Sequence, residues 1–134
     1  MVPCWNEEAT VGAVVRSFSA ALPGATIYVY DNNSTDRTRE EAAAAGAVVR
    51  RETRQGKGWV IQRMFADADV YVLVDGDNTY DAASARGMIE RLRAEQLDLV
   101  NGARVPFLLF ICNSGFEALG ARSGPSPAGP GASS

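Results

Sequence analysis

Two aspartates separated by one glycine, Asp75-Gly76-Asp77, are the residues of this sequence best suited to bind a divalent metal ion. They follow an apolar run, residues 70–74, of the kind that forms a strand covered on both faces. Two carboxylates held close together repel one another unless a cation lies between them, and glycine lets the chain turn sharply. A hard ion that bridges carboxylate and diphosphate oxygens relieves this repulsion. The pattern predicts a metal and diphosphate site, although Asp and Gly are also common in plain surface turns.

Other loops carry side chains that suit a nucleotide. Lys57, the single lysine of the chain, lies between two glycines, where the backbone can approach a phosphate or a base; the alternative is a solvated loop charge. Asp31 ends a β-branched and aromatic run, and it can accept hydrogen bonds from a base or ribose, or form an Asx turn. Trp5 can border the base or pack in the core. Glu7 can belong to the same site, or it can be only a charge at the start of a helix.

The composition restricts the chemistry. The chain has no histidine, which excludes Ser-His-Asp and Cys-His nucleophile systems and every His-ligated zinc site. Its cysteines, Cys4 and Cys112, are far apart in sequence, so a metal would be held by oxygen ligands, which favours Mg²⁺ or Mn²⁺. A net charge of -3 gives no indication of nucleic-acid binding.

The same sequence lacks the marks of membrane insertion and export. No run approaches the roughly 20 apolar residues of a transmembrane segment. The first residues have neither the basic nor the apolar region of a signal peptide. Two distant cysteines without a CxxC motif fit a reducing compartment. We therefore expect a cytoplasmic protein without a transmembrane segment.

Short apolar runs alternate with helical periods through most of the chain. Asn6 and Asp81 are expected to cap helices, and Gly46 to follow the end of another. The alternation predicts an α/β fold of Rossmann-like, three-layer type with a mostly parallel sheet, which binds ligands at the carboxyl ends of its strands. The expected strands are residues 2–4, 26–31, 47–51, 70–74 and 97–100.

Several segments match a known family in order and spacing. The sequence resembles family 2 glycosyltransferases, in the branch that makes polyprenyl-phosphate sugars, such as the dolichyl-phosphate mannose synthases. The matching segments are Val2-Pro3-Cys4-Trp5-Asn6-Glu7-Glu8 (VPxYNEE), Tyr30-Asp31-Asn32-Asn33-Ser34-Thr35-Asp36-Arg37-Thr38 (VDDGSTDxT), Gly56-Lys57-Gly58 (GKGxA), Val74-Asp75-Gly76-Asp77-Asn78-Thr79-Tyr80-Asp81 (the DxD segment) and Asn101-Gly102-Ala103-Arg104 (GSR). Each motif is weak alone, but together they are specific.

The resemblance implies a GT-A fold, a nucleotide-diphospho-sugar donor of UDP or GDP type, and Mg²⁺ or Mn²⁺. Asp75 would lie by the ribose and the metal, and Asp77 would ligate the metal as the candidate catalytic residue. Lys57 would lie near the base or the diphosphate. The full set implied for the nucleotide sugar is Pro3, Trp5, Glu7, Asp31, Lys57, Asp75, Gly76, Asp77 and Arg104.

The resemblance also implies a polyprenyl phosphate as acceptor, whose ionised phosphate can attack without a carboxylate base. We therefore expect a peripheral association with the cytoplasmic face of the membrane. Residues 1–104 are expected to form the nucleotide-sugar-binding half of a truncated GT-A domain. Residues 105–134 are expected to be a divergent tail, partly disordered because residues 124–134 are rich in Gly, Pro and Ser.

Three departures from the family pattern leave alternatives open. Asn32 and Asn33 replace the commoner Asp-Gly, and Trp5 replaces Tyr. No family motif follows Arg104, which keeps open a nucleotide-sugar-binding module without transferase activity. A nucleotidyltransferase is a third hypothesis, but it requires a glycine-rich phosphate loop directly after the first strand, and the sequence there is Trp-Asn-Glu-Glu.

Overall fold

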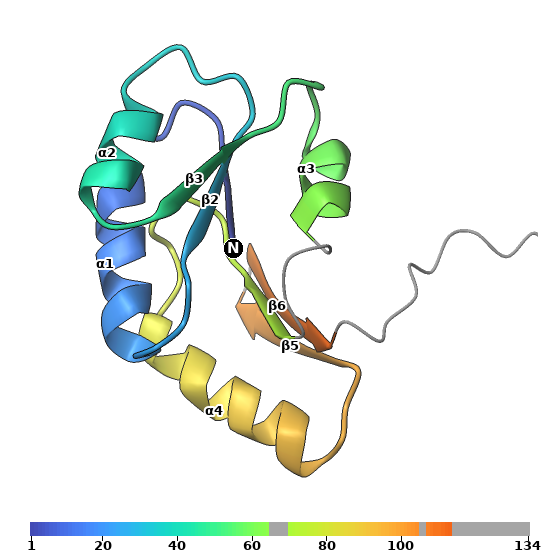
Figure 1. Cartoon of the computed structure of the whole chain (residues 1–134). Helices are drawn as coiled ribbons and strands as arrows, with labels where there is room; N and C mark the ends of the chain where they lie inside the picture. Colours follow the sequence, from blue (N-terminus) through green and yellow to red (C-terminus); the bar gives the residue numbers. More distant parts are fainter. Residues whose placement is uncertain (65–69, 105–106, 114–134) are drawn as a thin grey trace, which may run out of the picture.

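The computed structural model describes residues 1–64, 70–104 and 107–113, in which strands and helices alternate along the chain up to a final strand pair (Figure 1). This confirms the predicted α/β class. The elements are β1 (Val2–Cys4), α1 (Val11–Ala21), β2 (Tyr28–Asp31), α2 (Thr38–Ala44), β3 (Val48–Arg51), α3 (Lys57–Met64), β4 (Val70–Leu73), α4 (Ala82–Ala94), β5 (Leu99–Arg104) and β6 (Phe107–Asn113).

The strands form two ladders that Met1 connects. β1, β2 and β3 are parallel neighbours, whereas β6 lies between β4 and β5 and is antiparallel to both. The amino group of Met1 donates to the carbonyl oxygen of Val72 at 2.6 Å, and the Val74 amide donates to the Met1 carbonyl at 3.1 Å. These bonds place β4 beside β1, in the order β3-β2-β1-β4-β6-β5. Since β4 and β5 run in the same direction, β6 alone is reversed within the described sheet.

Alternate residues of β2 face two different helical layers, because successive side chains of a strand point to opposite faces. Ile27, just before the strand, and Val29 belong to a large apolar cluster with side chains of α1, α2 and α4. Tyr30 packs with Val60 and Met64 of α3 in a second cluster. The sheet is therefore covered on both faces, as a three-layer fold requires, and Figure 1 shows α3 apart from the other helices.

The first helix begins later than the sequence predicts. Asn6 has a φ of 55° and does not cap a helix, because α1 begins at Val11. The amides of Thr10 and Val11 donate instead to the Glu7 carbonyl, at 3.1 and 3.0 Å. Residues 5–10 thus form a loop at the carboxyl end of β1, so Glu7 belongs to that loop and not to the first turn of a helix.

Other predicted boundaries agree more closely. Asp81 caps α4, since its carboxylate accepts from the Ala83 amide at 3.1 Å, and Gly46 follows α2 with a φ of 97°. Residues 65–69, just before β4, lie outside the described residues. The predicted domain boundary after Arg104 stays a prediction, although β6 lies beyond it and pairs with β4 and β5. Residues 114–134 of the expected tail also lie outside the described residues.

Within the part of the chain that the structure describes, no helix combines the length and the apolar character that crossing a membrane requires.

Candidate functional site

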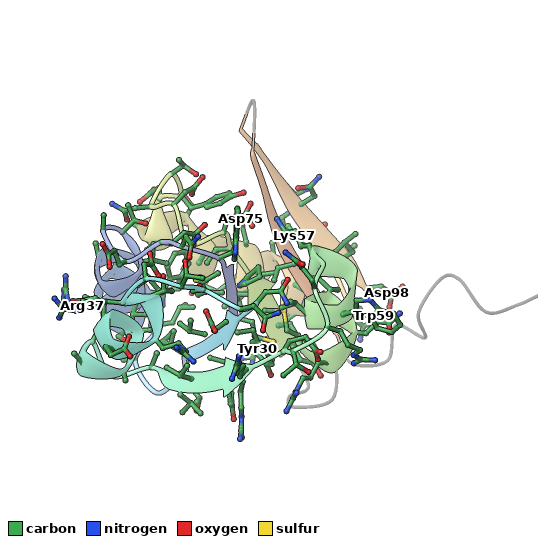
Figure 2. The ribbon with its side chains drawn as sticks, turned by 90° about the horizontal axis from the view of Figure 1, so that it is seen from above. Tyr30, Arg37, Lys57, Trp59, Asp75 and Asp98 are labelled. Carbon is green, nitrogen blue, oxygen red and sulfur yellow. The ribbon has the colours of Figure 1, made fainter. Side chains whose placement is uncertain are left out.

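The loops that follow β1, β2, β3 and β4 lie at one edge of the sheet, since parallel strands end on the same side. Lys57, at the start of α3, and Asp75, just after β4, meet there. The Nζ atom of Lys57 donates to Oδ1 of Asp75 at 2.5 Å, and Figure 2 shows the two residues beside one another. The structure therefore brings together two residues that the sequence analysis assigned to the donor site from separate motifs.

Glu7 lies against the Asp75-Gly76-Asp77 turn. A Cβ atom at position 76 would be 1.7 Å from Oε2 of Glu7 and 2.7 Å from Sγ of Cys4, so only glycine leaves room for this approach. Burial raises the pKa of the Glu7 carboxyl, and the nearby carboxylates of Asp75 and Asp77 raise it further, against the opposing effects of Cys4 and Lys57. Among the described residues, Glu7 Oε2 is a buried oxygen without a hydrogen-bond partner.

Asp77 is positioned by its own turn. Its Oδ1 accepts hydrogen bonds from the Thr79 amide at 3.2 Å and from the Thr79 hydroxyl at 2.8 Å. Asn78 between them has a φ of 61°, which Asn tolerates better than most residues. One oxygen of Asp77 is thus used to orient the carboxylate at the end of β4.

The carboxylates at this edge do not form a complete metal site by themselves. In the described residues, no group of three or more His, Cys, Asp or Glu side chains is arranged to hold a metal ion. Asp75 and Asp77 as metal ligands therefore stay a prediction, in which the ion would take its other ligands from a diphosphate. The like charges of the cluster and the unpartnered Glu7 oxygen are consistent with a cation at this place.

Asp31 ends β2 and is completely buried. Its Oδ1 accepts from the Ser34 amide, three residues further along the chain, at 3.1 Å, so this oxygen is used within the loop after β2. Nε of Arg39 lies 3.8 Å from its Oδ2, and neither atom has a hydrogen-bond partner among the described residues. Contact between Asp31 and a nucleoside therefore stays a prediction, and in this structure the side chain shapes the loop.

The remaining predicted residues are spread along the same edge. Trp5 is 59% exposed, so it does not pack in the core and its ring is accessible to a base. Pro3 is buried inside β1 in register with Tyr30, so its contact with a nucleoside also stays a prediction. Arg104 is the last residue of β5, whose carboxyl end is at this edge because β5 runs in the same direction as β4.

Hydrogen bonds between side chains and backbone join the loops after β1 and β2. The Asn6 amide donates to the Ser34 hydroxyl at 3.0 Å, and Oδ1 of Asn6 accepts from the Thr35 amide at 2.9 Å. The Glu7 amide donates to the Thr38 hydroxyl at 2.8 Å. These bonds hold Asn6 in its left-handed conformation and fix the backbone of Glu7. The roles of Ser34 and Thr38 were not predicted from the sequence, although both residues lie in the VDDGSTDxT-like segment.

Asn32 joins the loop after β2 to the loop after β3. Its Nδ2 donates to the carbonyl oxygens of Glu52 at 3.0 Å and Arg54 at 2.8 Å, and its Oδ1 accepts from the Gly56 amide at 2.8 Å. In the sequence, Asn32 stands out only as a departure from the family pattern. The sequence feature that could have indicated this role is an amide residue at a position where Asp is commoner in the family.

Glu52 stabilises the same loop after β3 through its buried carboxylate. Its side chain is 3% exposed, and its carboxylate accepts from the amide and the guanidinium of Arg54, with Arg63 3.7 Å away. The hydrogen bonds from Arg54 lower the pKa of the Glu52 carboxyl to about 2. The guanidinium of Arg54 also lies over the ring of Trp59, at 4.2 Å from its centroid.

Comparison with known proteins decides the family. The model of the family described as glycosyl transferase family 2 matches residues 1–108. The chain belongs to glycosyl transferase family 2. The match includes every residue that the sequence analysis assigned to the donor site.

Individual relatives agree with this family. The glycosyltransferase chain is 50% identical over 106 residues to the protein RfbJ of Shigella flexneri, which covers 78% of this chain and 82% of RfbJ. It is 36% identical over 107 residues to the glycosyltransferase AglJ of Haloferax volcanii, which covers 78% of this chain and 35% of AglJ. The chain thus spans most of RfbJ but about a third of AglJ.

Solved structures show the same fold. The glucosyl-3-phosphoglycerate synthase of Mycobacterium tuberculosis, crystallised with Mn²⁺, UDP-glucose and phosphoglyceric acid, superposes with a TM-score of 0.61 at 31% identity. The match covers 68% of this chain and 37% of the synthase. Another crystal of that synthase contains Mg²⁺ and UDP.

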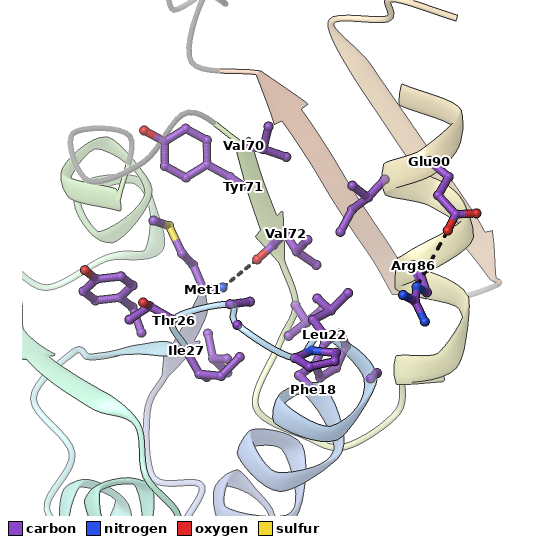
Figure 3. A pocket seen from close by; sticks show the side chains of 18 of the residues that line it. Met1, Phe18, Leu22, Thr26, Ile27, Val70, Tyr71, Val72, Arg86 and Glu90 are labelled. Carbon is purple, nitrogen blue, oxygen red and sulfur yellow. Dashed lines mark hydrogen bonds and ion pairs between the residues drawn. The ribbon is translucent and has the colours of Figure 1, made fainter. Parts of the chain in front are cut away.

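A cavity of about 580 Å³ lies at the opposite end of the sheet of this glycosyltransferase chain, away from the carboxylates (Figure 3). It is lined by the start of β2, the start of β4, the end of α1 and one side of α4. The buried amino group of Met1 borders it, and burial lowers the pKa of that amino group to about 5. This cavity is therefore distinct from the site at the carboxyl edge.

Proposed function

We propose that this chain binds a nucleotide-diphospho-sugar together with Mg²⁺ or Mn²⁺ at the carboxyl edge of its sheet and transfers the sugar to an acceptor. Family membership supports glycosyl transfer, and the related synthase was crystallised with UDP-glucose and Mn²⁺. The observation that carries the proposal is the meeting of Lys57 with the Asp75-Gly76-Asp77 turn, against which Glu7 packs.

Each residue of this cluster has a distinct task in the proposal. Asp77, and Asp75 beside it, would hold the metal ion, which when bound supplies positive charge to the departing nucleoside diphosphate. Lys57 adds a second positive charge near the diphosphate, within reach of Asp75. Gly76 lets Glu7 and the donor approach the backbone. Trp5, exposed on the loop after β1, borders the base.

The acceptor in this proposal is a polyprenyl phosphate. Support comes from the resemblance of residues 74–81 to the DxD segment of the polyprenyl-phosphate branch. A phosphate acceptor is ionised at neutral pH, so its oxygen attacks the sugar without a general base. The proposal therefore requires no general base among Glu7, Asp75 and Asp77, which lie on the donor side of the site. The enzyme would then work at the cytoplasmic face of a membrane, where its lipid acceptor lies.

A second candidate function is binding of a nucleotide sugar without transfer. The observation that favours it is the composition of the described site. All the candidate residues discussed above belong to the donor side.

Two measurements distinguish these functions. Calorimetry with UDP-glucose and GDP-mannose in the presence of Mn²⁺ measures donor binding, and incubation with radiolabelled donor and a polyprenyl phosphate measures transfer. Donor binding with lipid-linked product supports the transferase, and donor binding without product supports the binding module. Product with phosphoglyceric acid in place of the lipid phosphate would replace the polyprenyl acceptor in this proposal.

A further inference from the structure

Asn32 uses its side-chain amide on a single backbone turn. The Glu52 and Arg54 carbonyls accept from Nδ2, and the Gly56 amide donates to Oδ1, with all three distances between 2.8 and 3.0 Å. An amide side chain has two N–H donors and one carbonyl oxygen, so both donors and the acceptor are used. One side chain from the loop after β2 thus fixes the connection between β3 and α3.

The turn held by Asn32 leads directly into Lys57. Gly56 has a φ of 126°, a conformation that residues with side chains rarely adopt. Lys57 is the first residue of α3, and the Gly56 carbonyl accepts from the Trp59 amide at 3.1 Å in the first turn of that helix. The direction in which Lys57 leaves the turn therefore depends on the backbone that Asn32 holds.

We propose that Asn32 is a positioning residue for Lys57, and that its amide, not a carboxylate, is required for this role. The proposal rests on the proposed function, in which Lys57 contacts the donor. Aspartate has the same size but no N–H donors when ionised, so it would turn an oxygen toward the Glu52 and Arg54 carbonyls and repel them. The turn would open, and Lys57 would no longer be held beside Asp75.

Asn33 provides a matched control in the same loop. Its Nδ2 donates to the Thr53 carbonyl at 3.0 Å, one hydrogen bond to the same connection. Its φ of 67° is a conformation that glycine adopts without strain. Asn33→Gly therefore removes one bond to the connection but keeps the three bonds of Asn32.

Trp59 reports on the turn without any ligand, because the Arg54 guanidinium lies over its ring. Trp5 is replaced by Phe, so that Trp59 is the remaining tryptophan, and fluorescence is recorded with acrylamide as quencher. Asn32→Asp is expected to shift the emission and to raise the quenching constant by about half or more, and Asn33→Gly to leave both near the parent. Asn32→Ser, which removes the donors without adding charge, replaces Asn32→Asp if that variant does not fold. An unchanged Trp59 signal in a folded Asn32 variant overturns the proposal.

Donor calorimetry tests whether Asn32 acts through Lys57. Asn32→Asp is expected to weaken donor binding about tenfold, which corresponds to about 1.4 kcal/mol, because Lys57 would no longer be held beside the donor. In a Lys57→Ala background the same change is expected to have less than a twofold effect. A full tenfold loss in that background would mean that Asn32 contacts the donor itself, which overturns the positioning role. If the parent binds no donor, the proposed function fails, and the Trp59 signal still decides whether Asn32 holds the turn.

Discussion

Nζ of Lys57 lies 2.5 Å from Oδ1 of Asp75, so a charged hydrogen bond joins the loop after β3 to the end of β4. The Lys57 side chain is 59% exposed and that of Asp75 is 29% exposed. An ion pair with this much solvent contact contributes about 1 kcal/mol or less to folding. We therefore infer that the pair serves the site, where it places a cation next to the carboxylates that would hold the metal ion.

Lys57→Met is expected to weaken donor binding without unfolding the protein. The donor would lose a charge-assisted hydrogen bond, which corresponds to about a tenfold or greater rise in Kd. Arg86→Met is the control, because Arg86 forms an exposed ion pair with Glu90 on α4, away from the site. Isothermal calorimetry measures both variants. Equal affinities in the two would show that Lys57 does not contact the donor.

Gly76→Ala is expected to be harmful, because its Cβ would overlap Glu7 Oε2 and crowd the buried Cys4. Overpacking of this kind costs about 1–3 kcal/mol in the free energy of unfolding. Chemical denaturation followed by circular dichroism measures this loss.

Gly87→Ala is the matched control for the Gly76 variant. Gly87 lies within α4, and a Cβ there would meet no atom within 4 Å. Alanine in a helix interior stabilises by about 0.5–1 kcal/mol relative to glycine, so this variant should be slightly more stable than the parent. Similar stability for both variants would contradict the close approach of Glu7 to Gly76.

Glu52→Gln is expected to change how stability depends on pH. The folded-state pKa of Glu52 is about 2, below its ordinary value of 4.5, because Arg54 donates hydrogen bonds to the carboxylate. A depressed carboxyl pKa stabilises the fold above pH 4.5, and this contribution is lost as the pH falls from 4.5 toward 2. The variant should therefore melt at a lower temperature than the parent at pH 7, and the difference should shrink below pH 4.5. A constant difference across that range would exclude this contribution.

The fold was predictable because its signals are local. Continuous apolar runs and helical periods indicated most elements, and Asp81 caps α4 as its sequence position suggests. The start of α1 was not predictable in the same way. Asn6 is a good helix cap in isolation, but Ser34 and Thr35, from a different loop, hold it in a left-handed conformation. Such contacts between distant segments override local preference.

The residues of the candidate site were easier to predict from the sequence than their geometry. The positions of the motifs after the expected strands predicted that Lys57 and the Asp75-Gly76-Asp77 turn lie at one edge of the sheet. The structure confirms this position. The burial of Asp31 and the bonds of Asn32 were not visible in the sequence, because Asp and Asn at a strand end suit either a ligand contact or a turn. Strand β6 was also missed, since it pairs with β4, which lies far from it in the chain.

The most direct test of the account is the metal dependence of donor binding in the parent, in Asp77→Ala and in Asp98→Ala. Asp98 is an exposed aspartate between α4 and β5, so its variant controls for loss of charge alone. Calorimetry with UDP-glucose and GDP-mannose is carried out with Mn²⁺ and again with EDTA. We predict Mn²⁺-dependent binding of at least one donor by the parent and Asp98→Ala, and a loss of about tenfold or more in Asp77→Ala. Absence of binding to both donors, or binding that is unaffected by EDTA and by Asp77→Ala, would contradict the account.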